Sequence, residues 1–176
     1  DAPLRLVTFG ARGRGSFADA TSWHEYGTAA KYTAKALATH ESVWADAIYH
    51  VGDISYAVGI SAIWDLYAHM MSPAVSKVPY FLNVGNHEYD APSAAYADKG
   101  RERSFYNGSD SGGECGVPTH RQFRAPLAPD VDAPWYSLEL GPAHVVAMST
   151  EHDFRRGSAQ YRWLEADLAA VDKSVT

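Results

Sequence analysis

Three short apolar segments, each followed by a glycine, constrain the fold of this chain more than any other feature. They cover residues 4–9, 47–51 and 78–84. Between them, residues 28–39 are rich in Ala and Lys, and residues 60–71 repeat apolar side chains every three or four positions, so both are predicted to be helices. Thr28 is the predicted N-cap of the first helix, and Pro73 is predicted to end the second. This alternation of strands and helices predicts an α/β fold with right-handed crossovers.

The remainder of the chain predicts a hairpin and one more helix. Residues 135–140 and 144–149 read as two strands joined by a Gly-Pro turn, and residues 158–171 place apolar side chains on one helical face. Residues 89–133 carry little periodicity and read as a long loop, which in a compact domain usually has a function or lacks order.

Length and charge limit the classes of protein to which the chain can belong. Its 176 residues suit a single domain over residues 1–176. A formal net charge of -6 has the wrong sign for a nucleic-acid binder. Its apolar runs are too short to cross a bilayer, so neither nucleic acid nor membrane insertion is expected.

Polar side chains that suit metal ions follow two of the predicted strands. Asp53 and Tyr56 come after the second strand, and Asn86 and His87 come after the third. In open α/β sheets, ligands bind beyond the carboxyl ends of the strands, so these side chains are expected to meet. A carboxylate can bridge two cations, an amide oxygen is a neutral hard ligand, and an imidazole can move protons.

A phosphate ester would be a fitting substrate for such a site. Its hydrolysis needs a nucleophile at moderate pH and positive charge opposite the phosphoryl oxygens, and two cations about 4 Å apart supply both. Because the whole chain is acidic, the phosphate would have to be attracted by local charge such as bound metal ions.

Several motifs resemble one known family. Gly52-Asp53-x-x-Tyr56 and Gly85-Asn86-His87-Glu88 resemble signature blocks of the purple acid phosphatases, within the calcineurin-like metallophosphoesterase superfamily. Further segments that resemble one large-subunit branch of that family lie at residues 111–117, 135–137, 149–153 and 157–164. The resemblance covers nearly the whole chain and corresponds to the N-terminal part of the catalytic domain.

This resemblance implies a role for each of the four residues. Asp53 would bridge two metal ions, Tyr56 would bind Fe(III), and Asn86 would bind a divalent Zn, Mn or Fe(II). His87 would be the catalytic residue, which contacts the phosphate or assists the leaving group. The implied fold is a two-sheet sandwich flanked by helices, of which this chain holds a βαβαβ core, a hairpin and a C-terminal helix. The implied activity is acid phosphatase action on phosphate monoesters by a secreted protein, in agreement with the glycosylation sequon at Asn107.

The chain departs from the family pattern in two respects. The first family block reads Gly-Asp-x-Gly, whereas this chain has Ala11 in place of the aspartate and Arg12 beside it, which adds positive charge at the gap. The later blocks that supply histidine ligands are absent from the 176 residues. We therefore expect weak or lost phosphatase activity, with a non-catalytic structural or binding subunit as the alternative. A missing C-terminal segment or another chain is expected to complete the fold, and His152 is expected to be structural.

Overall fold

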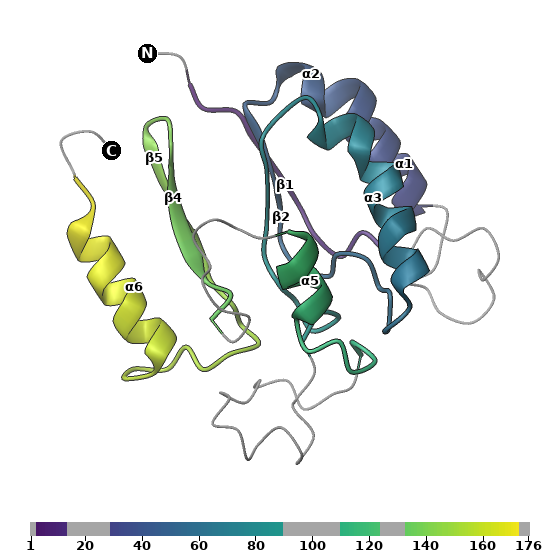
Figure 1. The fold of residues 1–176 in the computed structure, drawn as a ribbon. Coiled ribbons are helices and arrows are strands. Elements are labelled where there is room, and N and C mark those ends of the chain that lie inside the picture. The colour runs from purple at the N-terminus through teal and green to yellow at the C-terminus, as the bar shows by residue number, and fades with distance from the viewer. Residues whose placement is uncertain (1–2, 14–28, 90–109, 124–132, 173–176) are drawn as a thin grey trace.

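The computed structural model describes residues 3–13, 29–89, 110–123 and 133–172. These residues form four layers, which Figure 1 shows side by side: the helix α6, the hairpin of β4 and β5, a parallel sheet of β1 to β3, and the helices α1 to α3. The α/β class predicted from the sequence is confirmed.

The parallel sheet is the centre of the fold. It consists of β1 (Leu6–Phe9), β2 (Ala47–His50) and β3 (Tyr80–Leu82) in that order. Val7 pairs with Ile48, which in turn pairs with Tyr80. All four residues of β2 are buried, as expected for a central strand covered on both faces. The carboxyl ends of the three strands therefore lie at one edge of the sheet.

Helices cover one face of this sheet. They are α1 (Ala29–Ala36), the π-helical turn η1 (Leu37–Glu41), α2 (Ser42–Trp44) and α3 (Ser61–Val75). The larger core cluster lies beneath them and includes Ile48 of β2, Leu82 of β3 and the α3 residues Trp64, Tyr67 and Met71. Thr28, the predicted N-cap of α1, lies outside the described residues.

The expectation that Pro73 ends α3 was wrong, because the helix continues to Val75. A proline inside a helix leaves the carbonyl four residues earlier, here that of His69, without its N–H partner. His69 is exposed, so water can hydrate that carbonyl. The helix then closes with a bond from the Ser76 N–H to the Ser72 carbonyl at 3.0 Å.

The hairpin covers the opposite face of the sheet. It consists of β4 (Tyr136–Leu140) and β5 (Ala143–Ala147), which pair antiparallel as predicted. A second core cluster joins Tyr136, Leu138 and Ala147 of the hairpin to Leu6, Tyr49 and Phe81 of the parallel sheet. The two sheets therefore form part of a sandwich, which agrees with the fold that the resemblance implies.

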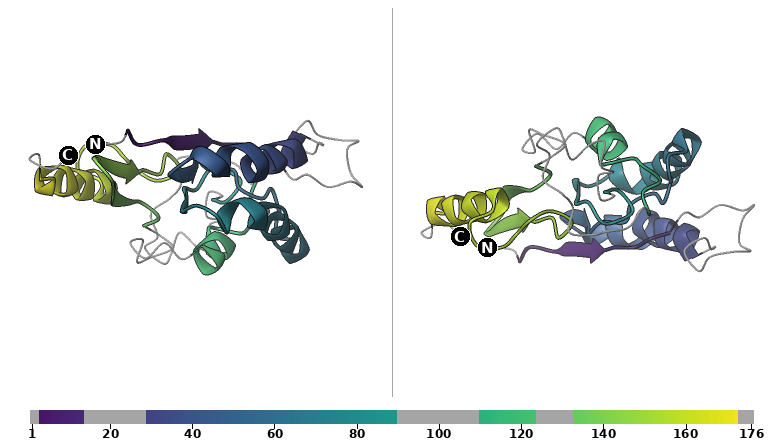
Figure 2. Two further views of the ribbon diagram at one scale, coloured as in Figure 1. Left: turned by 90° about the horizontal axis from the view of Figure 1, so that it is seen from above. Right: turned by 90° about the horizontal axis from the view of Figure 1, so that it is seen from below.

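Two further helices complete the described residues. The predicted C-terminal helix is present as α6 (Ala159–Ala170), which lies against the hairpin in both views of Figure 2. Its N-cap is Ser158, whose Oγ accepts the Tyr161 N–H at 3.1 Å. The short helix α5 (Val117–Gln122) lies within the segment predicted to be a loop. None of the described helices is long and apolar enough to span a bilayer.

Candidate functional site

Asp53, Tyr56 and His87 are brought together at the carboxyl edge of the parallel sheet. Asp53 adopts a left-handed backbone conformation with φ 53°, which aspartate tolerates better than most residues. Its Oδ2 accepts the Tyr56 hydroxyl at 3.3 Å, and its Oδ1 accepts the His87 backbone N–H at 3.3 Å. The convergence expected from strand order is therefore present for these three residues.

Glycines make this close approach feasible. A β-carbon on Gly85 would lie 2.2 Å from Asp53 Oδ1, and one on Gly52 would lie 3.0 Å from the Cα of Gly85. Gly52 also has a φ of +66°, where residues with a side chain are strained. The two motifs therefore begin with glycine for a steric reason. Without a side chain at either position, the loop after β2 and the loop after β3 can touch.

Glu88 fastens the two loops together. Its side chain is fully buried and accepts backbone N–H groups from Asp53 at 2.9 Å, Ile54 at 2.7 Å and Gly85 at 2.9 Å. Burial raises the pKa of Glu88 to about 8, although the Ile54 and Gly85 N–H groups act in the opposite direction. Glu88 closes the third-strand motif in the sequence, but its role as the anchor of Asp53 was not foreseen.

The imidazole of His87 packs on the phenol ring of Tyr56. Their ring centroids are 4.0 Å apart with an interplanar angle of 40°. Both side chains are buried, with relative exposures of 8% and 4%. The phenol that the resemblance assigns to iron is therefore covered by the imidazole that it assigns to the phosphate.

Asn86 makes its side-chain contact with a residue that no sequence argument singled out. Its Nδ2 donates to Asp110 Oδ2 at 2.9 Å. This bond orients the amide and leaves its oxygen as the atom suited to a cation. The role of Asn86 as a metal ligand remains a prediction.

Ala11 lies beside the second-strand loop but contributes no ligand atom. Its backbone N–H donates to the Gly52 carbonyl at 3.3 Å, so the position where the family carries a carboxylate is next to Asp53 in space. Ala11 has a φ of 48°, a left-handed conformation that suits aspartate better than alanine.

Arg12 does not direct its charge at this gap. Its Nη1 donates to the Ala30 carbonyl of α1 at 3.1 Å, and its guanidinium carbon lies 4.7 Å from the centre of the Tyr67 ring of α3. The side chain is 5% exposed, and burial lowers its pKa. The structure therefore places Arg12 against the helical layer, contrary to the expectation that it occupies the place of a cation.

Glu151 is a carboxylate near the site that sequence reasoning missed. It follows β5 and is 9% exposed, and its Oε1 accepts the Thr150 hydroxyl at 3.3 Å. Burial raises the pKa of Glu151, and the negative charge of Asp53 raises it further, so the two carboxylates are close enough to interact. Its place shortly after β5 is the sequence signal that indicates it.

His152 is structural, as expected. Its Nδ1 is 2.9 Å from the Ser149 Oγ, and its ring packs edge-on against Tyr89 with centroids 4.5 Å apart. Burial lowers the pKa of His152 to about 4, so the imidazole is neutral near pH 7.

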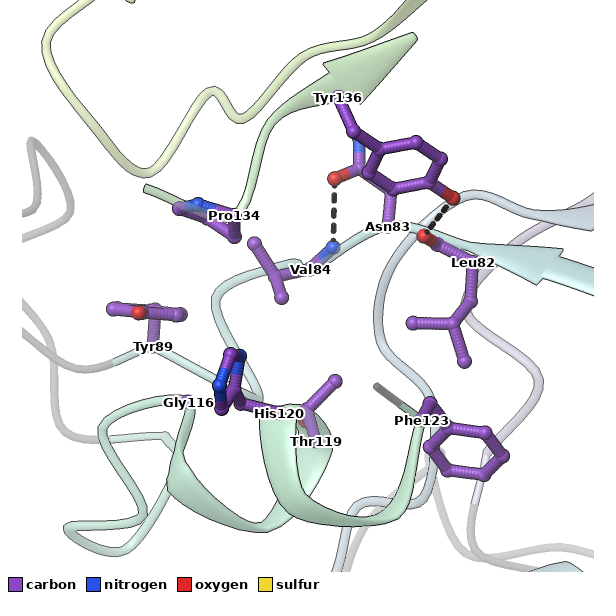
Figure 3. Close-up of a pocket in the computed structure, with 10 residues that line it drawn as sticks. All are labelled: Leu82, Asn83, Val84, Tyr89, Gly116, Thr119, His120, Phe123, Pro134 and Tyr136. Carbon is purple, nitrogen blue, oxygen red and sulfur yellow. Dashed lines mark hydrogen bonds between the residues drawn. The ribbon is translucent and has the colours of Figure 1, made fainter. Parts of the chain in front are cut away.

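A small pocket is lined by residues from the end of β3, from α5 and from the start of β4 (Figure 3). Its wall includes Leu82, Val84, Tyr89, Thr119, Phe123 and Tyr136, and the Tyr136 hydroxyl donates to the Leu82 carbonyl at 2.7 Å. The cavity volume of about 30 Å³ has room for little more than a water molecule. This pocket is therefore too small to be a substrate site.

The donor atoms of the described residues do not fit a pair of metal ions. Asp53 offers two carboxylate oxygens, Tyr56 and Asn86 offer one oxygen each, and Ala11 offers none. Within the described ranges, no three His, Cys, Asp or Glu side chains are grouped so that they could hold a metal ion. Even one structural zinc ion usually takes four ligands.

Comparisons with known proteins identify the family, although no family model matches the chain. “Probable inactive purple acid phosphatase 27” of Arabidopsis thaliana is 38% identical over 98% of this chain and 27% of its own length. “Nucleotide pyrophosphatase/phosphodiesterase” of Hordeum vulgare is 30% identical over 96% of this chain and 43% of its own. The solved purple acid phosphatase PPD1 from yellow lupin seeds matches with a TM-score of 0.82 and 34% identity, over 97% of this chain and 28% of that one.

The chain spans about a quarter of the length of the relative named first, 27%, and the fold of its described residues is that of the metallophosphoesterases. By motif order, sequence identity and structural similarity, the chain belongs to the purple acid phosphatase family.

Proposed function

We propose that Asp53, Tyr56, Asn86 and His87 form part of the active site of a phosphatase that acts on phosphate monoesters. We also propose that this chain by itself hydrolyses such esters weakly or not at all. The observation that carries the proposal is the convergence of Asp53, Tyr56 and His87 at the carboxyl edge of the sheet. Ala11, which offers no ligand atom beside Asp53, is the reason to expect weak or no activity.

On this proposal, a two-ion centre of Fe(III) with Zn, Mn or Fe(II) is incomplete in the described residues. We infer that its remaining ligands come from residues beyond these 176 or from another chain, since this chain spans only 27% of its Arabidopsis relative. On this proposal residues 1–176 are one part of a catalytic domain. Asp53, Tyr56 and Asn86 are its proposed metal ligands, and His87 is its proposed phosphate contact.

Turnover of an aryl phosphate tests this activity. The chain would be supplied with ferric iron and zinc and assayed at acidic pH beside Asp53→Asn, which removes the bridging charge. We expect release of aryl alcohol at or barely above the rate of the metal blank, with any excess lost in Asp53→Asn. Robust turnover that Asp53→Asn leaves unchanged would place the chemistry elsewhere in the chain.

A diester substrate should be included in the same assay. The barley relative carries the name nucleotide pyrophosphatase/phosphodiesterase. A bis-aryl phosphate that is cleaved faster than the monoester would shift the proposal from monoesterase to diesterase.

A non-catalytic subunit is the second candidate function. Ala11 and the word “inactive” in the name of the Arabidopsis relative both favour it. It predicts that the chain folds and binds its partner with no turnover under any metal supply. Turnover that disappears in Asp53→Asn would overturn this alternative.

We also propose that the protein is secreted and carries a glycan on Asn107. The sequon and the family support this, while Asn107 itself lies outside the described residues. Peptide mass spectrometry of the protein from its natural source, before and after enzymatic deglycosylation, checks it. A secreted sample with unmodified Asn107 would contradict the glycan.

A further inference from the structure

Polar groups connect the helix α6 to the hairpin and to Ser149, which follows β5. Gln160 is its one buried residue, and the side-chain amide of Gln160 bonds both backbone groups of Ser149, at 2.7 Å and 2.8 Å. Towards the other end of the helix, Leu168 is 49% exposed. Apolar burial therefore contributes little to the docking of the C-terminal half of α6.

A cluster of ionisable groups lies at that weakly packed half. The imidazole of His144 on β5 places Nε2 2.8 Å from Asp167 Oδ2 of α6 and Nδ1 2.6 Å from Glu139 Oε1 of β4. Ser137 of β4 donates to the other oxygen of Asp167 at 2.5 Å. The cluster thus connects both strands of the hairpin to the helix.

Both ring nitrogens of His144 face carboxylate oxygens. A carboxylate only accepts hydrogen bonds, and a neutral imidazole has one N–H donor, so the two contacts can form together only when the ring is protonated. Deprotonation would leave one ring nitrogen lone pair facing a carboxylate oxygen. The geometry is therefore that of an imidazolium held between two anions.

We propose that His144 is a pH-sensitive clamp that holds the C-terminal half of α6 on the β4–β5 hairpin when the imidazole is protonated and loosens it when the proton leaves. Asp167 is the stronger partner, because its side chain is 16% exposed while that of Glu139 is 60% exposed. The charged and polar groups that face the ring are Asp167 from α6, Glu139 from β4 and the Ser137 hydroxyl that orients Asp167.

The direction of the pH effect follows from the same groups. Hydrogen bonds to Asp167 and then to Glu139 raise the pKa of His144 above its ordinary value of 6.5. A raised pKa in the folded state means that the clamp contributes fully below pH 6.5 and loses its contribution as pH rises through the higher folded value. The helix is thus held most firmly under acidic conditions. This inference does not depend on the proposed phosphatase activity.

Amide hydrogen exchange of the whole chain tests the clamp locally. Protection of residues 164–170, corrected for intrinsic exchange rates, would be compared between about pH 5.5 and about pH 8.5, on either side of the ordinary histidine pKa. We expect protection to fall by about threefold with rising pH, because a partly exposed ion pair contributes a free energy of that size. In His144→Gln, protection should equal the high-pH level at both pH values.

Control variants separate the clamp from general effects. His69→Gln changes an exposed histidine of α3 and should keep the wild-type pH response. If His144→Gln does not fold, Asp167→Asn serves instead, and the pKa of His144 measured by NMR should drop in it. Protection that is independent of pH in the wild type, or an NMR pKa of His144 at or below its ordinary value, would overturn the proposal.

Discussion

Gly85 and Asp53 are packed so closely that no other residue fits at position 85. A β-carbon there would lie 2.2 Å from Asp53 Oδ1 and 2.8 Å from the Asp53 backbone nitrogen. The contact joins the loops after β2 and β3, and it fixes where the carboxylate of Asp53 points. The geometry of the whole candidate site depends on this close contact between Gly85 and Asp53.

Gly85→Ala should therefore displace Asp53 and lower stability. Overpacking of this kind costs about 1–3 kcal/mol in the free energy of unfolding. Urea unfolding measures it, beside Gly141→Ala, whose added β-carbon meets no atom within 4 Å and which carries only the strain of a φ of +58°. A Gly85→Ala chain as stable as the wild type would contradict the close packing.

Glu88→Gln should also destabilise the fold strongly. Above pH 8, where Glu88 is ionised, its carboxylate accepts three backbone N–H groups, and a glutamine would turn an NH₂ towards at least one of them. Leaving a buried donor without an acceptor costs about 1–3 kcal/mol. Urea unfolding at about pH 9 checks this. The control, Asp65→Asn on the exposed face of α3, should change stability by less than about 0.5 kcal/mol.

Ala11→Asp should add a carboxylate beside Asp53 and increase the affinity for a divalent cation. The left-handed backbone at Ala11 accommodates aspartate, although the added charge repels Asp53 until a cation is bound. We expect zinc to bind roughly tenfold tighter in calorimetric titration, the lower end of the effect of one supporting residue on metal affinity. Ala11→Asn has the same shape without the charge, and an equal gain in that variant would rule out the carboxylate as the cause.

His152 should make the protein sensitive to acid. Because its folded pKa of about 4 lies below the ordinary 6.5, its contribution is present above pH 6.5 and is lost as pH falls through about 4. The difference between these two pKa values corresponds to about 3 kcal/mol in the free energy of unfolding. Between neutral pH and about pH 4, the free energy of unfolding should fall less steeply in His152→Phe than in the wild type. Equal slopes would show that His152 titrates normally.

The sequence predicted the fold well where periodicity and strand order decide it. Leu6–Phe9, Ala47–His50 and Tyr80–Leu82 form strands because each is a short apolar run closed by a glycine turn. Their parallel order follows from the intervening helices. The helix α5 was missed because its six residues are too few to show a period.

The candidate site was predictable only in part. Asp53 and Tyr56 are three positions apart in one loop, so their contact is local. The bond between Asn86 and Asp110 and the approach of Glu151 to Asp53 join distant segments, and no local pattern encodes them. The direction of Arg12 likewise depends on the position of α1, which the sequence does not specify.

Metal content is the most direct test of the central claim, that these residues alone cannot hold two ions. The chain would be reconstituted with ferric iron and zinc, freed of unbound metal by gel filtration, and measured by elemental mass spectrometry together with its visible spectrum. The account predicts less than about one ion per chain and no phenolate-to-iron band, because Ala11 supplies no ligand and the side chains of Asp53, Tyr56 and Asn86 are too few to complete the coordination of an ion. Two ions per chain, with a visible band that Tyr56→Phe abolishes, would contradict it.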